Sequence, residues 1–152
     1  MPDIEMAKAY ESREKRVIEI TEDKRKSYMS YKAITNTSSP QYKLQERAYT
    51  DSETGIRMVG GRYCVATGSG ISHTIGTYLD VTLDSDVVIE CIVGDAKDNR
   101  HTINSHLQGL DGSTIEFIVD TDALPEEVRQ SGDLSSLDEW DSKVVSIVKY
   151  IE

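Results

Sequence analysis

The feature that most constrains this chain is a series of short β-type segments, separated by turn-forming residues, that begins at Gly55. The segments are rich in β-branched and aromatic residues, and several alternate polar with apolar side chains. They are RYCVAT (62–67), YLDVTL (78–83), VVIECIV (87–93), TIEFIVD (114–120) and KVVSIVKYI (143–151). Sequences such as GSG and DSD lie between them and favour turns. Five or six strands of this length predict a mainly β domain over residues 55–152, closed or nearly closed into a barrel.

Two helices are also expected. A short one is predicted at 122–130, where an acidic residue can cap the helix and a proline falls in its first turn. A longer helix of alternating charge is predicted at 5–27, within a charged segment that spans residues 1–27. Its apolar residues form only a thin stripe (Met6, Tyr10, Val17 and Ile20), which suits a stalk or a weak self-association segment better than a core helix. Residues 28–54 are interpreted as an irregular linker with room for one strand.

The acidic charge is concentrated in the second part of the chain. Residues 1–50 contain ten Lys or Arg and eight Asp or Glu, whereas residues 51–152 contain seven and nineteen, for a net charge of −10 overall. A phosphate backbone attracts basic surfaces, so we expect no nucleic-acid partner. No apolar stretch approaches the roughly 20 residues that a membrane-spanning helix needs. The N-terminal residues contain no apolar signal core, which leaves the location open between the cell wall, a phage particle and the cytosol.

Cysteine and histidine residues are few. Cys64 and Cys91 both lie in apolar strand-like segments, and two interpretations are open. They are either buried free thiols that pack as small hydrophobic side chains, or one disulfide that joins two strands in an oxidising compartment. His101 and His106 lie near Asp95 in the sequence, but their spacing matches no zinc motif. We therefore expect neither a metal nor another cofactor.

The order of the motifs resembles the three-aspartate (3D) domain over roughly residues 60–151. A strand entering VATGS is followed by IGTYLDVTL, VIECIVGDAKD, STIEFIVD, a helix leading into QSGDLS, and VVSIVKY. The chain also resembles proteins of gram-positive bacteria and their phages with similar segments. The resemblance implies a six-stranded double-psi-type β-barrel with one short helix. Relatives of that barrel include lytic transglycosylase A and the cell-wall-associated RlpA-like proteins.

The same resemblance implies candidate site positions. TIGTY resembles the Ile-Pro-x-Gly-Thr turn of the family. IVGDAK places Asp95 at the second aspartate, and TIEFIV places Glu116 where the family has its third aspartate. The chain departs from the pattern in two places. Residues 67–69 (Thr-Gly-Ser) stand where the first aspartate would follow its strand, and residues 96–98 (Ala-Lys-Asp) replace the glycines after the second.

The resemblance implies peptidoglycan as the substrate or ligand. Breaking a β-1,4 glycosidic bond needs a carboxyl group that protonates the leaving oxygen, and intramolecular transglycosylation can reuse the same group as a base. Asp95 is the candidate general acid/base and Glu116 its charge partner. Three basic residues nearby are candidates for binding the anionic or hydroxyl groups of a glycan (Lys97, Arg100 and His101).

A non-catalytic alternative remains open at each of these positions. Asp95 can be a turn residue that accepts backbone N–H groups. Strand alternation puts Glu116 on the face opposite Ile115 and Phe117, where it can be simply solvated. Trp140 can either form a sugar-stacking platform with nearby tyrosines or close the core. The chain would then be a structural or peptidoglycan-binding module of a phage or prophage assembly, attached through its N-terminal helix.

Overall fold

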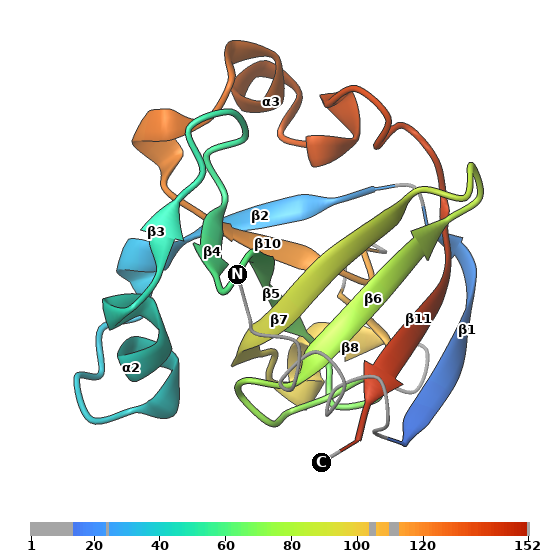
Figure 1. The fold of residues 1–152 in the computed structure, drawn as a ribbon, viewed down its shortest axis with the longest axis horizontal. Helices are drawn as coiled ribbons and strands as arrows, with labels where there is room; N and C mark the ends of the chain where they lie inside the picture. Colours follow the sequence, from blue (N-terminus) through green and yellow to red (C-terminus); the bar gives the residue numbers. More distant parts are fainter. Residues whose placement is uncertain (1–13, 24, 104–105, 110–112, 152) are drawn as a thin grey trace.

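The structure, a computed structural model, describes residues 14–23, 25–103, 106–109 and 113–151 (Figure 1). The strands are β1 (Lys15–Asp23), β2 (Ser27–Ser30), β3 (Tyr49–Thr50), β4 (Arg57–Val59), β5 (Arg62–Thr67), β6 (Tyr78–Leu83), β7 (Val88–Ala96), β8 (Thr102–Ile103), β9 (Gln108–Gly109), β10 (Glu116–Val119) and β11 (Val144–Tyr150). Between them lie helices α2 (Pro40–Glu46) and α3 (Glu126–Ser131) and the 3-10 turns η1 (Tyr31–Ala33), η2 (Asn99–His101), η3 (Thr121–Ala123) and η4 (Leu134–Ser136). The prediction of a mainly β fold is confirmed.

Each of the five β-type segments predicted from the sequence contains a strand: β5, β6, β7, β10 and β11. The helix predicted at 122–130 is present in two pieces, η3 and α3. Leu124 and Pro125 separate them because both adopt extended backbone angles. Gly132 ends α3 with a positive φ of 70°, the left-handed conformation that glycine adopts without strain.

The strands form one mixed sheet with the order β1-β11-β6-β7-β5-β10-β2, and β4 and β3 extend it from β5. β8 and β9 form a separate two-stranded sheet. The ladders are antiparallel except for β5 with β7 and β2 with β10, which are parallel. The two strands that carry the predicted carboxylates, β7 and β10, are therefore both neighbours of β5.

The sheet is strongly curled. Its edge strands β1 and β2 are consecutive in the chain and are joined by residues 24–26 only, a connection that spans at most about 14 Å. Figure 1 shows β1, β11, β6 and β7 running in a different direction from β2 and β10. The described ladders include no pairing between β1 and β2, so the structure shows a curled sheet, and the closed double-psi barrel remains an expectation from the resemblance.

The predicted N-terminal helix is wrong for residues 15–23, which form strand β1, while residues 5–13 lie outside the described part of the chain. Val17 and Ile20 suit a helical stripe, but Ile18 and Ile20 also alternate with exposed neighbours, as a strand requires. Pairing with β11, in which Ile18 lies opposite Ile147, decides between the two periods. The predicted linker, residues 28–54, contributes β2, η1, α2 and β3.

The inner face of the sheet carries the main hydrophobic core. Buried side chains reach it from both ends of the strand order, including Ile18 of β1 and Phe117 and Val119 of β10. Trp140 packs against this core, with its ring 5.1 Å from that of Phe117 and 5.4 Å from that of Tyr63. Of the two interpretations of Trp140, the structure supports closure of the core.

The outer face carries a smaller cluster that consists of Leu44 from α2 with Cys64, Ile92 and Ile118 from the sheet. Cys64 and Cys91 are both free and buried, as one interpretation predicted. Cys91 pairs with Tyr63, the neighbour of Cys64, so the two thiols point to opposite faces of the sheet. This arrangement explains why no disulfide joins them.

Candidate functional site

Asp95 and Glu116 lie in one row across three neighbouring strands. Ala66 of β5 pairs with Asp95 of β7 on one side and with Glu116 of β10 on the other. Paired residues on adjacent strands point to the same face, so both carboxylates stand on the outer face. Two strand spacings separate their Cα atoms by about 10 Å. Between them, Ala66 contributes only a methyl group to this face.

A β-bulge at Gly94 puts Asp95 into this row. Val93 pairs with Val65 and Asp95 pairs with Ala66, so two residues of β7 advance where β5 advances by one. Val93 belongs to the inner core, and regular alternation would return Asp95 to the same inner face. The extra residue is Gly94; a Cβ there would lie 2.8 Å from Cδ1 of Ile118, so a larger residue requires that side chain to shift.

The two carboxylates line one open hollow of about 460 Å³. Its described lining consists of Ala66, Asp95, Ala96, Lys97, Asp98, His101, Gly109 and Glu116. Of the three predicted binding residues, Lys97 and His101 belong to this lining. Arg100 does not belong to it; its side chain is exposed, and its Nε lies 3.2 Å from Oδ2 of Asp98. This hollow, which we name the Asp95 hollow, thus presents acidic and basic side chains together.

Asp95 is held by one of its two carboxylate oxygens. Oδ1 accepts hydrogen bonds from the backbone N–H of Ala96 at 2.9 Å and from Nε2 of Gln41 at 3.4 Å. Oδ2 accepts none from the residues that the structure describes. The predicted turn role therefore accounts for one oxygen only. Gln41 lies in the segment interpreted as a linker, and no sequence motif marked it.

The turn after β7 is made by Asp98. Its carboxylate accepts a hydrogen bond from the backbone N–H of Arg100 at 3.1 Å, and its carbonyl accepts one from the N–H of His101 at 2.8 Å. These contacts start η2 and bring His101 back over the hollow. Glu116 is partly buried between the fully buried Ile115 and Phe117, as alternation predicted.

Residues 67–69, where the resemblance would place a first aspartate, have a packing role in this chain. The Thr67 side chain is fully buried, and its Oγ1 donates a hydrogen bond to the carbonyl of Ser72 at 2.9 Å. At Gly68 a Cβ would lie 2.1 Å from the carbonyl oxygen of His106, so only glycine fits. Ser69 donates a hydrogen bond to Oδ1 of Asn99 at 2.6 Å. These contacts hold the loop after β5 against the segment after β7.

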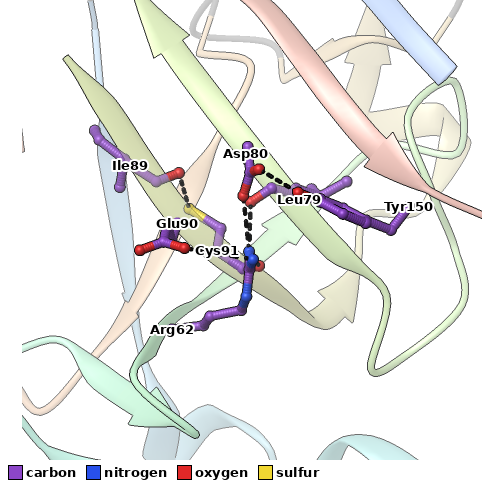
Figure 2. A network of polar contacts seen from close by, with 7 residues as sticks. All are labelled: Arg62, Leu79, Asp80, Ile89, Glu90, Cys91 and Tyr150. Atoms are coloured by element: carbon purple, nitrogen blue, oxygen red, sulfur yellow. Dashed lines mark hydrogen bonds and ion pairs between the residues drawn. The ribbon is translucent and has the colours of Figure 1, made fainter. Parts of the chain in front are cut away.

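A second polar cluster on the outer face surrounds Arg62 (Figure 2). Nη1 donates hydrogen bonds to Oδ1 of Asp80 at 2.9 Å and to the carbonyls of Leu79 and Cys91. Nη2 lies 3.5 Å from a carboxylate oxygen of Glu90. We name this set, with Tyr150, the Arg62 network. Sequence reasoning missed it, although Arg62, Asp80 and Glu90 are charged residues inside strand segments.

Aromatic rings enclose the Arg62 network. The guanidinium carbon lies 4.2 Å from the ring centre of Tyr78 and 5.6 Å from that of Tyr150. The hydroxyl of Tyr150 donates a hydrogen bond to Oδ2 of Asp80 at 2.6 Å. This hydrogen bond raises the pKa of Tyr150, and burial adds to the rise. Both oxygens of Asp80 are engaged, so this cluster ties four strands together.

Another hollow, of about 480 Å³, lies between η1 and α2. It is lined by Tyr31, Lys32, Ile34, Thr35, Thr37, Tyr42, Gln45 and Glu46. The guanidinium of Arg57 stacks on the Tyr31 ring at 4.3 Å and also bonds to Oε1 of Gln45 at 3.0 Å. This hollow contains one acidic and one basic side chain and no pair of carboxylates, so acid/base chemistry favours the Asp95 hollow.

Comparisons with known proteins identify no relative of this chain: no protein-family model matches it, and no curated protein or solved structure is significantly similar to it. Within the described residues, no helix is long and apolar enough to cross a membrane. The same residues contain no group of three or more His, Cys, Asp or Glu side chains arranged to hold a metal ion.

Proposed function

We propose that this chain acts on bacterial peptidoglycan and that the Asp95 hollow cleaves its glycan strands by a lytic-transglycosylase-like reaction. The observation that supports the proposal most directly is the register across β7, β5 and β10, which sets Asp95 and Glu116 side by side over Ala66. The resemblance to the three-aspartate domain names the same two positions. A cell-wall or phage-particle location is part of this proposal.

The reaction needs one carboxyl group that changes role. Asp95 donates its proton to the glycosidic oxygen while the C1–O bond breaks, and the departing sugar leaves as an alcohol. The Asp95 carboxylate then takes the proton of the C6 hydroxyl as that oxygen bonds to C1, which forms a 1,6-anhydro sugar and restores the acid. No water is consumed. Glu116 supplies negative charge near the positive charge that develops on the sugar ring.

Lys97 and His101 give the same hollow two groups that bind a glycan. Lys97 supplies hydrogen-bond donors and a positive charge for the carboxylates of the peptidoglycan stem. His101 supplies a ring nitrogen for a sugar hydroxyl. Lys97 follows β7 directly and His101 ends the 3-10 turn η2 after it, so the segment that continues from the Asp95 strand supplies both binding groups.

The alternative function is a peptidoglycan-binding module without catalysis, and one observation favours it. The position of the family's first aspartate is Thr67, whose hydroxyl is buried and bonded to a backbone carbonyl. It therefore supplies no third carboxylate to the hollow. Under this alternative the same hollow binds glycan but leaves it intact.

Product analysis separates these functions. Purified peptidoglycan is incubated with the wild-type protein, Asp95→Asn, Glu116→Gln and the exposed control Asp84→Asn, and soluble products are identified by mass spectrometry. Anhydro-muropeptides released by the wild type and Asp84→Asn, but not by Asp95→Asn, are the expected result. Co-sedimentation of all four proteins with peptidoglycan without soluble products would instead establish the binding module. If the wild-type protein neither releases soluble products nor co-sediments with peptidoglycan, both functions are contradicted.

A further inference from the structure

Helix α2 is capped by Ser39 and is fixed on the outer face of the sheet at two points. The hydroxyl of Ser39 accepts a hydrogen bond from the N–H of Tyr42 at 3.1 Å and caps the helix start. Leu44 is 4% exposed and packs among the apolar side chains of β5, β7 and β10. At the other end, Arg57 donates hydrogen bonds to the carbonyls of Gln45 and Ala48 at 3.0 and 3.1 Å.

This anchoring determines where Gln41 points. Gln41 lies three residues before Leu44, and residues at this spacing share one face of a helix. Leu44 faces the sheet, and its Cδ2 lies 3.6 Å from the position a Cβ of Gly94 would take. Gln41 therefore faces the sheet beside the bulge, and its Nε2 reaches Oδ1 of Asp95 at 3.4 Å.

We infer that Gln41 is a positioning residue for Asp95, which holds Oδ1 and directs the proton or the ligand of this carboxyl to Oδ2. A carboxylate oxygen has two lone-pair sites, and at Oδ1 the N–H of Ala96 and the amide of Gln41 occupy both. Neither donor gives up its proton at any pH at which the protein is folded. Oδ2, which accepts no hydrogen bond from the described residues, is left to carry the proton.

This inference deepens the proposed function and rests on it for the catalytic consequence. A general acid must present its proton in one direction, since a misplaced group loses much of its catalytic effect. Among the described residues, the backbone supplies this carboxyl with one donor only, the N–H of Ala96. The contact from α2 supplies the missing constraint in both the protonated and the ionised states.

The contact itself is tested without any reaction. The side-chain amide signals of Gln41 are recorded by ¹⁵N–¹H NMR in the wild type, in Asp95→Ala and in the control Asp84→Ala, with Gln130 as an internal reference. We expect Asp95→Ala to shift the Gln41 signals and leave those of Gln130 in place, and Asp84→Ala to shift neither. Gln41 signals that do not respond to Asp95→Ala would overturn the inference, whether or not the protein cleaves peptidoglycan.

The catalytic consequence is tested with Gln41→Met, which keeps the chain length but removes both donors, and with Gln130→Met on α3 as its match. We expect Gln41→Met to lower kcat for anhydro-muropeptide release about tenfold with KM within about twofold and an unchanged unfolding temperature. Gln41→Glu should lower kcat further, because it places a negative charge beside Asp95. An unchanged kcat in both Gln41 variants would refute the positioning role. If the wild type releases no products, the proposed function fails and the NMR result alone decides the orientation of Asp95.

Discussion

The outer face of the sheet carries two charged clusters that differ in how their charges are satisfied. In the Arg62 network, both oxygens of Asp80 accept hydrogen bonds, and the guanidinium lies against two tyrosine rings. In the Asp95 hollow, the described residues hold Asp95 through Oδ1 alone, and the hollow has a volume of about 460 Å³. The first cluster has little capacity left for a ligand, whereas the second retains an oxygen and room beside it.

The difference follows from the side chain that β5 contributes to each cluster. In the Arg62 network, β5 contributes a long cation that reaches across β7 to the Asp80 carboxylate of β6. In the row of Asp95 and Glu116, the β5 position is Ala66, which bridges nothing. The charged residues on this sheet face are therefore engaged where β5 contributes an arginine that pairs with them, whereas Asp95, beside an alanine of β5, retains a carboxylate oxygen that accepts no hydrogen bond from the described residues.

Removing the cation from the Arg62 network has the largest expected effect. Arg62→Met leaves Asp80 without its ion-pair partner and removes the hydrogen bonds of the guanidinium to two strand carbonyls, so we expect the free energy of unfolding to fall by about 3–5 kcal/mol. Urea unfolding followed by circular dichroism measures it. Arg100→Met is the matched control, because its pair with Asp98 is exposed and is worth less than about 1 kcal/mol. Equal losses in both variants would contradict the assignment of Arg62 as structural.

Alkaline pH removes a further contribution to stability. Burial raises the pKa of Cys64 from 9.0 to about 11, and the pKa of Tyr150 is raised as well. The folded state therefore holds these protons more tightly than the unfolded state. This stabilisation is complete below pH 9 and is lost as the pH rises through 11, on the order of 3 kcal/mol for Cys64 alone.

The thiol contribution is isolated by comparison with Cys64→Ala. The variant is less stable at pH 7 because a buried side chain is truncated, but its stability should fall less steeply between pH 9 and pH 11. The measurement is a series of urea unfolding curves across that range. Parallel pH profiles for the wild type and the variant would rule out Cys64 as the source of the alkaline loss.

Gly94 lies beside the apolar cluster of the outer face and directly precedes Asp95. We expect its substitution to lower the free energy of unfolding by an intermediate amount. A Cβ at this position meets Cδ1 of Ile118 at 2.8 Å, so Gly94→Ala should cost about 1–2 kcal/mol through overpacking. Ile118→Val removes that methyl group. The double variant should therefore be more stable than the sum of the two single effects predicts, in a double-mutant cycle of unfolding free energies. Simple additivity would show that Ile118 does not limit this site.

The strands were predictable from the sequence because five segments combine β-branched residues with turns at their ends. The N-terminal strand was not, because Val17 and Ile20 fit a helical period while Ile18 and Ile20 fit a strand period. Only the distant strand β11, which supplies hydrogen bonds from Val144–Tyr150, selects between them. Pairing partners of this kind are not visible in a local pattern.

The candidate site was predictable to a similar extent. The resemblance placed Asp95 and Glu116 at strand ends, and the structure brings them to one hollow with Lys97 and His101. Gln41 was not predictable, because it reaches Asp95 from a helix 54 residues earlier in the chain. The bulge at Gly94 was also hidden, since a glycine at the end of an apolar run indicates a turn as readily as a bulge.

The smallest effect on stability is expected for Asp95→Asn, and the same substitution at Asp80 allows the two clusters to be compared directly. Asp95→Asn keeps an oxygen that accepts from Ala96 and Gln41, so we expect the free energy of unfolding to change by less than about 0.5 kcal/mol. Asp80→Asn removes the charge that opposes Arg62 and should cost several times more. Both variants are measured by urea unfolding and by release of soluble muropeptides. Loss of product release in the stable Asp95→Asn, with retained release in folded Asp80→Asn, assigns chemistry to the hollow and stability to the network; the reverse pattern would exchange the two roles.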